Sequence, residues 1–139
     1  MIIGTCAVLL TGASPPGTDV TVSVTGLRNQ KGKVLACLTA NPKGFPDCTH
    51  DAGARRLVIP ANAAGRIDFG PVAPGIYAVA LLHDENGNGK PDMMLVMPRE
   101  GFGFSRDAPV RFGPPSFKSA AFQVGAAAVH QTIKMRYMF

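Results

Sequence analysis

Tryptophan is absent from this chain of 139 residues, and its aromatic residues are eight phenylalanines and two tyrosines. Long apolar runs are absent as well, since none reaches the roughly 18 residues that a membrane-spanning helix requires. The sequence therefore predicts no transmembrane segment. Its length suffices for one domain with a moderate core, and a hydrophobic fraction of 46% is ordinary for such a domain.

Short catalytic motifs are also lacking, since the chain contains neither G-x-S-x-G nor H-E-x-x-H. A hydrolase would have to use His83 beside Asp84 and Glu85. Its nucleophile would be Ser105 or Ser116. Adjacent residues on a strand point to opposite faces, so His83 and Asp84 cannot serve one site without a bulge. We therefore predict a non-enzymatic protein, with a hydrolase as the weaker alternative, and the scattered His and Cys residues do not suggest zinc.

The net charge of +5 and the isoelectric point near 9.5 raise the question of nucleic acid binding. The basic residues are scattered singly, and Arg55 and Arg56 form the one adjacent pair. The run from Arg99 to Phe104 resembles an aromatic RNA-binding submotif, but Glu100 interrupts it and no helices follow. We expect no nucleic acid partner.

Charged residues are missing from the first part of the chain, and the first of them is Asp19. Residues 1–13 are predicted to be a signal segment, because small residues at Thr11 and Ala13 suit a cleavage site. Residues 14–19, SPPGTD, would be a linker to a domain of residues 20–139. A buried first strand, or a lipid-bearing Cys6 with a true start further upstream, remains open as an alternative.

Only three cysteines are present, and removal of the leader would leave Cys37 and Cys48. Their spacing encloses LTANPKGFPD, a segment rich in turn formers, which a disulfide would hold in place. An even cysteine count suits an oxidising compartment. We predict a Cys37–Cys48 disulfide in a periplasmic or secreted bacterial protein, with two unpaired thiols as the alternative.

Apolar and polar residues alternate in several short segments, which is typical of half-buried strands. Residues 20–25 place Val20, Val22 and Val24 on one face. A hairpin turn at residues 29–32 is expected to return the chain as a strand over residues 33–40. The apolar segment IYAVALLH predicts a central strand covered on both faces. With 16 glycines and 12 prolines, the sequence predicts an all-β fold, a single antiparallel β-sandwich of about seven strands of prealbumin-like or immunoglobulin-like type.

Four phenylalanines lie in the Gly- and Pro-rich segment REGFGFSRDAPVRFGPPSF. We expect an ordered covering loop over a sheet edge, because so many rings are costly to leave in water. The predicted binding loop consists of Phe102, Phe104, Ser105, Phe112 and Phe117. Its rings would bind a carbohydrate or a cell-envelope ligand.

The stretch HDENGNGKPD carries oxygen-bearing side chains at alternate positions around glycines. This pattern predicts a Ca²⁺ loop over residues 84–92 with Asp84, Asn86, Asn88, Asp92 and the Lys90 carbonyl as ligands. Leu95 takes the twelfth position, where an EF-hand has glutamate, so tight binding would need Glu85, Glu100 or a distant carbonyl as a further ligand. A metal-free turn remains the alternative, because Asn-Gly pairs favour hairpin turns.

The successive segments GLRNQKGKVLACL, FGPVAPGIYAVALLHDENGNGKPD, MPREGFGFS and RFGPPSFKSAAFQV resemble the bacterial secreted family known as domain of unknown function 2141. The resemblance implies an exported β-sandwich of the transthyretin-like or carboxypeptidase-regulatory-like kind, with no established activity. It places residues 101–105 and 113–117 in one family motif, and in another it places His83, Asp84, Asn86, Asn88 and Asp92. The sequence thus predicts an exported, non-enzymatic β-sandwich of unknown partner with a structural Ca²⁺ loop.

Overall fold

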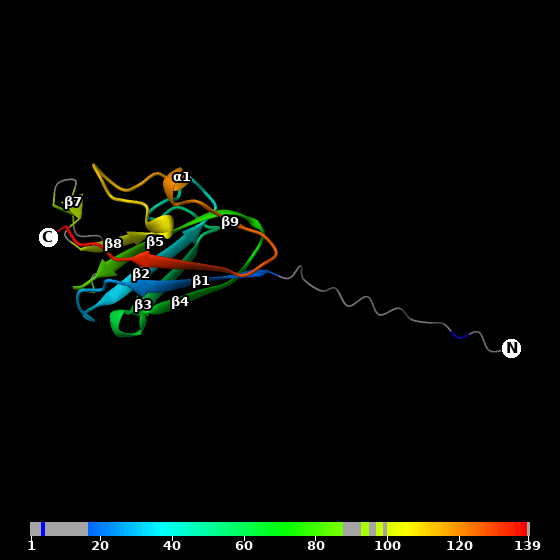
Figure 1. The fold of residues 1–139 in the computed structure, drawn as a ribbon, viewed down its shortest axis with the longest axis horizontal. Coiled ribbons are helices and arrows are strands. Elements are labelled where there is room, and N and C mark those ends of the chain that lie inside the picture. Colours follow the sequence, from blue (N-terminus) through cyan, green and yellow to red (C-terminus); the bar gives the residue numbers. More distant parts are fainter. Residues whose placement is uncertain (1–3, 5–16, 88–92, 95–96, 99, 139) are drawn as a thin grey trace.

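Two β-sheets pack face to face in the computed structural model, which describes residues 4, 17–87, 93–94, 97–98 and 100–138 (Figure 1). One sheet contains β10 (Val129–Lys134), β1 (Thr18–Thr25) and β4 (Arg66–Val72), in that order. The other contains β3 (Arg55–Pro60), β2 (Lys33–Thr39), β5 (Gly75–Asp84) and β8 (Gly101–Phe104), and β9 (Phe122–Val124) also pairs with β5. The predicted all-β sandwich is confirmed.

The remaining elements are short. They are the 3-10 helices η1 (Ala61–Ala63) and η2 (Ser105–Asp107), the helix α1 (Phe117–Ala120), and the paired strands β6 (Met93–Met94) and β7 (Met97–Pro98). Within the described part of the chain, no helix has the length and apolar character needed to cross a membrane.

The start of β1 differs slightly from the sequence-based boundary. Thr18 and Asp19 belong to β1, although residues 14–19 were expected to form a linker. The Thr18 side chain is buried, and its hydroxyl donates a hydrogen bond to the Gly125 carbonyl. The predicted signal segment, residues 1–13, lies outside the described residues apart from Gly4.

Alternating residues on the strands form the core between the two sheets. Val20, Val22 and Val24 of β1 are buried, as the sequence predicts. On β2 the inward residues are Val34, Ala36 and Leu38, and near the C-terminus they are Ile133 and Met135. The hydrophobic effect thus fixes which face of each strand is turned inward.

The predicted hairpin at residues 29–32 is wrong, because β1 and β2 belong to different sheets. β1 pairs in antiparallel fashion with β4 and in parallel with β10, and β2 pairs with β3 and β5. The turn chemistry indicated that the chain reverses there. It did not determine whether the next strand continues the same sheet or crosses to the opposite one, since both choices bury the same apolar face.

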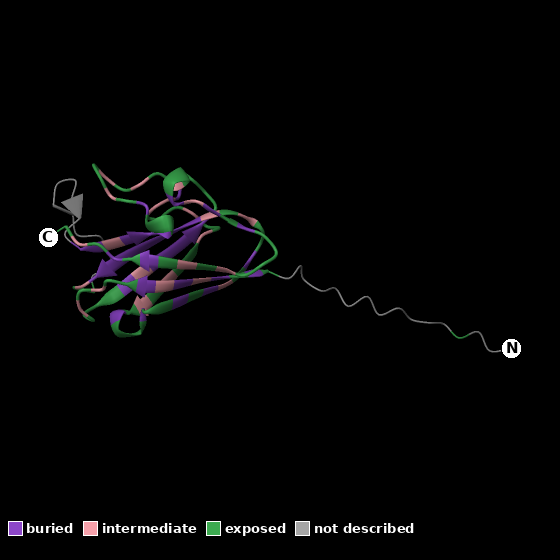
Figure 2. Ribbon diagram, in the orientation of Figure 1, coloured by how far each residue is buried: buried purple, intermediate pink, exposed green. Residues whose placement is uncertain are grey.

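β5 is buried on both faces, as predicted. All residues from Ala78 to Asp84 are buried, and Figure 2 shows the strand in purple along this length. Val79 and Leu81 belong to the main core, whereas Ala78 and Ala80 belong to a second, smaller cluster on the opposite side. We call that opposite side, which is turned away from the three-stranded sheet, the outer face of the five-stranded sheet.

The sequence GFGF, expected to be irregular, forms β8 along the edge of β5. Its glycines face the main core, where space is short. A Cβ on Gly101 would overlap the Tyr137 ring, and one on Gly103 would lie 2.7 Å from Cγ2 of Ile133. Phe102 and Phe104 alternate with these glycines and therefore face outward. The Gly-Phe alternation is the period-two pattern of a strand, which the glycine content concealed.

The C-terminal segment is fastened to the end of β5 through His83. The His83 ring is completely buried, and its Nε2 lies 2.8 Å from the Lys31 carbonyl oxygen. A carbonyl only accepts, so Nε2 carries the proton and Nδ1 accepts from the Tyr137 hydroxyl at 2.6 Å. Burial raises the pKa of Tyr137 above its ordinary value, which keeps the phenol protonated.

Arg28 and Glu85 cover this junction from the solvent side. The Arg28 guanidinium lies 4.4 Å from the centre of the Tyr137 ring, and its Nε donates to Glu85 Oε1 at 2.5 Å. The hydrogen bond from Arg28 lowers the pKa of Glu85 below its ordinary value. Glu85 is therefore engaged with the fold, and its carboxylate is directed to Arg28.

Tyr137→Phe removes the hydroxyl that His83 and the Arg28 backbone share, and leaves a buried imidazole nitrogen without its donor. We expect the free energy of unfolding to fall by about 1–2 kcal/mol. Tyr77→Phe is the matched control, because the Tyr77 hydroxyl bonds only the exposed Ala73 carbonyl, and it should cost less than about 0.5 kcal/mol. Urea denaturation measures the free energy of unfolding of both variants. Equal losses of stability would contradict the proposed role of the Tyr137 hydroxyl at His83.

Glu85→Gln should destabilise the protein by about 0.5 kcal/mol at pH 7, the size typical of an exposed ion pair. Because the pKa of Glu85 is lowered in the folded state, its contribution is present above the ordinary carboxyl pKa. It is lost as the pH falls through the lowered pKa. Denaturation curves of both proteins should therefore converge in acid, and a difference that persists to about pH 2 would refute the ion-pair explanation.

Candidate functional site

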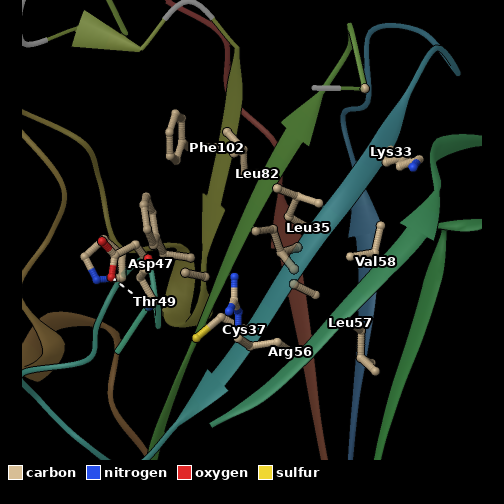
Figure 3. Close-up of a pocket in the computed structure, with 16 residues that line it drawn as sticks. Lys33, Leu35, Cys37, Asp47, Thr49, Arg56, Leu57, Val58, Leu82 and Phe102 are labelled. Carbon is tan, nitrogen blue, oxygen red and sulfur yellow. Dashed lines mark hydrogen bonds between the residues drawn. The ribbon is translucent and has the colours of Figure 1, made fainter. Parts of the chain in front are cut away.

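A groove with a volume of about 370 Å³ lies on the outer face of the five-stranded sheet (Figure 3). Its floor consists of two rows of cross-strand neighbours. The first row is Arg56, Cys37, Ala80 and Phe104, and the second is Val58, Leu35, Leu82 and Phe102. Most of these side chains are apolar, and Val58 is 62% exposed. The volume lies in the range of small-molecule binding sites.

One wall of the groove is formed by the loop between β2 and β3. Cys37 in the floor is joined to Cys48 in this loop by a disulfide, with the two Cα atoms 6.3 Å apart. Pro46, Asp47 and Thr49 line the groove beside it. The predicted cysteine pairing thus has a local consequence, because it holds this wall over the sheet.

Beside the groove, the outer face is covered by a second, smaller core. The partly buried Phe45 packs against it, and its ring meets those of Phe104 and Phe117 edge-on at centroid distances of 5.8 and 6.0 Å. Ala78, Ala80, Ala108 and Ala120 pack in the same cluster. Sequence reasoning missed Phe45, although its place next to Pro46 within the cysteine loop was a signal that the loop carries its own anchor.

The four rings of the predicted binding loop have different surroundings. Phe104 is only 2% exposed, while Phe102 stacks on it at 6.1 Å and lines the groove. Phe117 belongs to the smaller core. Phe112 is fully exposed and lines a second, shallower hollow that shares no lining residue with the groove. The rings therefore do not form one covering surface, and only Phe102 and Phe104 reach the groove.

Ser105, also predicted for the binding loop, is completely buried at the end of β8. Its hydroxyl accepts from the Val79 N–H at 2.9 Å and donates to the Ala120 carbonyl at 2.5 Å. These bonds join β5 to the segment before β9, where the strand ladder is interrupted. The side chain is occupied by backbone groups and takes no part in the groove.

Three ionisable side chains line the groove, namely Lys33, Arg56 and Asp47. Asp47 accepts a hydrogen bond from the Thr49 N–H at 3.2 Å. Figure 3 shows the Arg56 side chain extending across Cys37 into the groove. The neighbouring Arg55 is used differently, because its guanidinium donates to the Phe69 and Pro71 carbonyls of the opposite sheet at 2.9 and 2.6 Å.

The predicted Ca²⁺ loop begins at the end of β5. Asp84 is completely buried and Glu100 is 5% exposed. The last pair of the β5–β8 ladder is His83 opposite Gly101, and Asp84 comes directly after His83 while Glu100 comes directly before Gly101. Asn86 is exposed. Asn88, Lys90 and Asp92 lie outside the described residues. Among the residues that are described, no three His, Cys, Asp or Glu side chains come together in a group that could hold a metal ion.

The catalytic alternative is centred on His83, and this ring lies in the main core. Both of its nitrogens are engaged, by Tyr137 and by the Lys31 carbonyl. Asp84 lies on the opposite face of the same strand, as alternation requires. Ser105 is bonded to backbone groups elsewhere. The residues of the suggested catalytic cluster are therefore not brought together.

Comparison with known proteins identifies one relationship. No curated protein and no solved structure matches the chain. A family model described as an uncharacterised protein conserved in bacteria, domain of unknown function 2141, matches residues 22–132, which run from β1 to β10 and include the whole floor of the groove. The chain belongs to this bacterial family, domain of unknown function 2141.

Proposed function

We propose that this protein is an exported, non-enzymatic binding module that holds an apolar ligand in the groove on the outer face of its five-stranded sheet. The observation that carries the proposal is the groove itself, a hollow of about 370 Å³ whose floor leaves Leu35, Val58 and Phe102 partly or largely exposed. Apolar side chains left accessible in a concave site gain free energy when a ligand excludes water from them.

Export is supported by three features. The family is bacterial, the first thirteen residues carry no charge, and Cys37 and Cys48 form a disulfide. Disulfides persist in the periplasm and outside the cell, where the reducing thiols of the cytosol are absent. The disulfide also holds the loop that forms one wall of the groove, so an oxidising compartment would preserve the proposed binding site.

The absence of catalysis is supported by the environment of two of the three histidines, His83 and His130. His83 lies in a closed core. The exposed His130 has its two ring nitrogens within hydrogen-bond distance of the Thr21 and Ser23 hydroxyls, at 2.7 and 2.9 Å. That site lies on the three-stranded sheet, whereas the groove floor belongs to the five-stranded sheet. A binding role therefore accounts better for the groove than a hydrolytic one.

Within the envelope ligands expected from the sequence, the groove favours an alkyl chain over a sugar. Sugars stack on open aromatic faces, whereas Phe104 is buried and Phe102 is stacked against it. The three residues that share a row with Phe102, namely Leu35, Leu82 and Val58, are aliphatic. Such a surface suits a flexible hydrocarbon chain.

Titration with 1-octanol tests the groove directly. Methyl NMR signals of Leu35, Val58 and Leu82 should shift together, while those of Val22 and Ile133 in the main core should not. Phe102→Ala should weaken octanol binding about fivefold, because roughly 1 kcal/mol of apolar contact is lost. Phe112→Ala is the matched control and should change nothing, since that ring is fully exposed and lines the other hollow.

A melt of both phenylalanine variants verifies that they remain folded. The proposal fails if octanol causes no shifts in the groove up to its solubility limit. It also fails if the folded Phe102→Ala and Phe112→Ala proteins lose affinity equally, since the groove would then have no special part in binding.

We propose a second function, a structural Ca²⁺ site at residues 84–92. The supporting observation is that Asp84 and Glu100 are buried next to each other at the two ends of the segment that contains this motif. Carboxylate oxygens are the preferred ligands of Ca²⁺, and Glu100 would supply the acid that the twelfth position lacks. Glu85 is not the recruited ligand in this proposal, because Arg28 holds its carboxylate.

Thermal melts of the full chain with chelator, Ca²⁺ or Mg²⁺ test this second proposal. A hundredfold excess of Ca²⁺ over its dissociation constant should stabilise the fold by about 2.7 kcal/mol and raise Tm by several degrees. Asn86→Ala combined with Asp92→Ala should abolish the rise, and Asp19→Ala, an acidic residue on β1, should leave it intact. Identical melts of the unmutated protein in all three conditions would exclude the site.

A further inference from the structure

We infer that the groove selects a single-chain amphiphile with a carboxylate head group, a fatty-acid-like ligand, and that Arg56 is the residue that contacts its carboxylate. This inference rests on the proposed binding function of the groove. It adds the chemical class of the ligand and the residue that distinguishes it from a neutral or cationic molecule with the same hydrocarbon chain.

Arg56 has the position and the freedom that this role requires. It lies opposite Cys37 in the strand register, and Figure 3 shows its side chain reaching over Cys37 into the groove. Within the described part of the chain, no carboxylate lies within ion-pair distance of its guanidinium. Arg55 and Arg28, by contrast, are both engaged by groups of the protein itself. Arg56 is thus a cation in the groove with unused donors.

Lys33, the other cation of the groove, is less suited to bind an anion. It pairs in register with Asp84, and residues opposite each other in a ladder have their side chains on the same face. The negative charge of Asp84 therefore offsets Lys33 at that end of the sheet. At the Arg56 end, the register neighbours are Cys37 and Ala80, which carry no charge. Asp47, the carboxylate on the loop wall of the groove, is exposed, and among the described residues it does not lie within ion-pair distance of Arg56. Arg56 therefore keeps its positive charge without an ion-pair partner in the described part of the chain.

The dimensions of the floor indicate one hydrocarbon chain. From Arg56 on β3 to Phe102 and Phe104 on β8 there are three strand spacings, or roughly 14 Å. The residues between them, Leu35 and Leu82, are apolar. A volume of about 370 Å³ is near the lower end for ligand sites, which favours a single-chain molecule over a two-chain phospholipid. A guanidinium can bind a carboxylate through two parallel hydrogen bonds.

Three probes that each carry a straight chain of eight carbons, counting the carboxyl carbon of octanoate, test the head-group selectivity, namely octanoate, 1-octanol and octyltrimethylammonium. All three are titrated into the full chain below their micelle concentrations, and the methyl signals of Leu35, Val58 and Leu82 report binding. Octanoate should bind about tenfold more tightly than octanol, because a charge-assisted hydrogen bond is added. Octyltrimethylammonium should bind more weakly than octanol.

Arg56→Gln should reduce octanoate affinity about tenfold, to the level of octanol, without changing the affinity for octanol itself. Arg56→Glu should reverse the order of the two charged probes. Arg66→Gln is the matched control, because it removes the same charge from β4 in the opposite sheet and should leave all three affinities unchanged.

The outcomes separate this inference from the function on which it rests. If octanol shifts the groove signals but octanoate binds no better, or if Arg56→Gln and Arg66→Gln have the same effect, the carboxylate inference is wrong and the binding function stands. If none of the three probes shifts the groove signals, both are wrong. A tenfold preference for octanoate that is lost only in the Arg56 variants supports both.

Discussion

The burial of β5 on both faces is the constraint on which the rest of this structure depends. Its inner face is covered by the three-stranded sheet, and its outer face needs a cover of its own, because Ala78 and Ala80 would otherwise be in water. The Phe45 loop and the segment after β8 provide that cover over one half of the outer face. Among the described residues, the cover over the rest of this face is incomplete, and the groove is the space that remains. The candidate site is therefore a consequence of how the central strand is packed.

The disulfide and the glycines of β8 define this space from two sides. The bond from Cys37 to Cys48 holds the β2–β3 loop against the sheet, and the loop in turn brings Phe45 onto Phe104 and Phe117. On the other side, Gly101 and Gly103 let the C-terminal segment approach β8 closely. Because side chains alternate along a strand, Phe102 and Phe104 then point to the outer face. Both features are covalent or steric limits on the backbone, and the apolar surface of the groove follows from them.

The sequence predicted what depends on local alternation and missed what depends on pairing. Val20, Val22 and Val24 were correctly assigned to the core, because one apolar face suffices for that conclusion. The hairpin at residues 29–32 was wrong, since alternation does not specify the neighbouring strand. The same limit applied to the site. Phe102 and Phe104 stood out as rings, but Arg56 was one of fourteen basic residues with no distinguishing pattern. Only the register, which places it opposite Cys37, makes it a candidate for ligand binding.

The register also shows that the two proposed sites are neighbours. The row beyond Val58, Leu35, Leu82 and Phe102 contains Lys33 and Asp84, and Gly87 lines the groove. Asp84 is thus both the first expected Ca²⁺ ligand and the charge that offsets Lys33. A bound Ca²⁺ would withdraw that negative charge and leave Lys33 uncompensated, which would strengthen the positive potential of the groove. If both proposals hold, Ca²⁺ and a carboxylate ligand should favour each other's binding, because each reduces the electrostatic cost of the other.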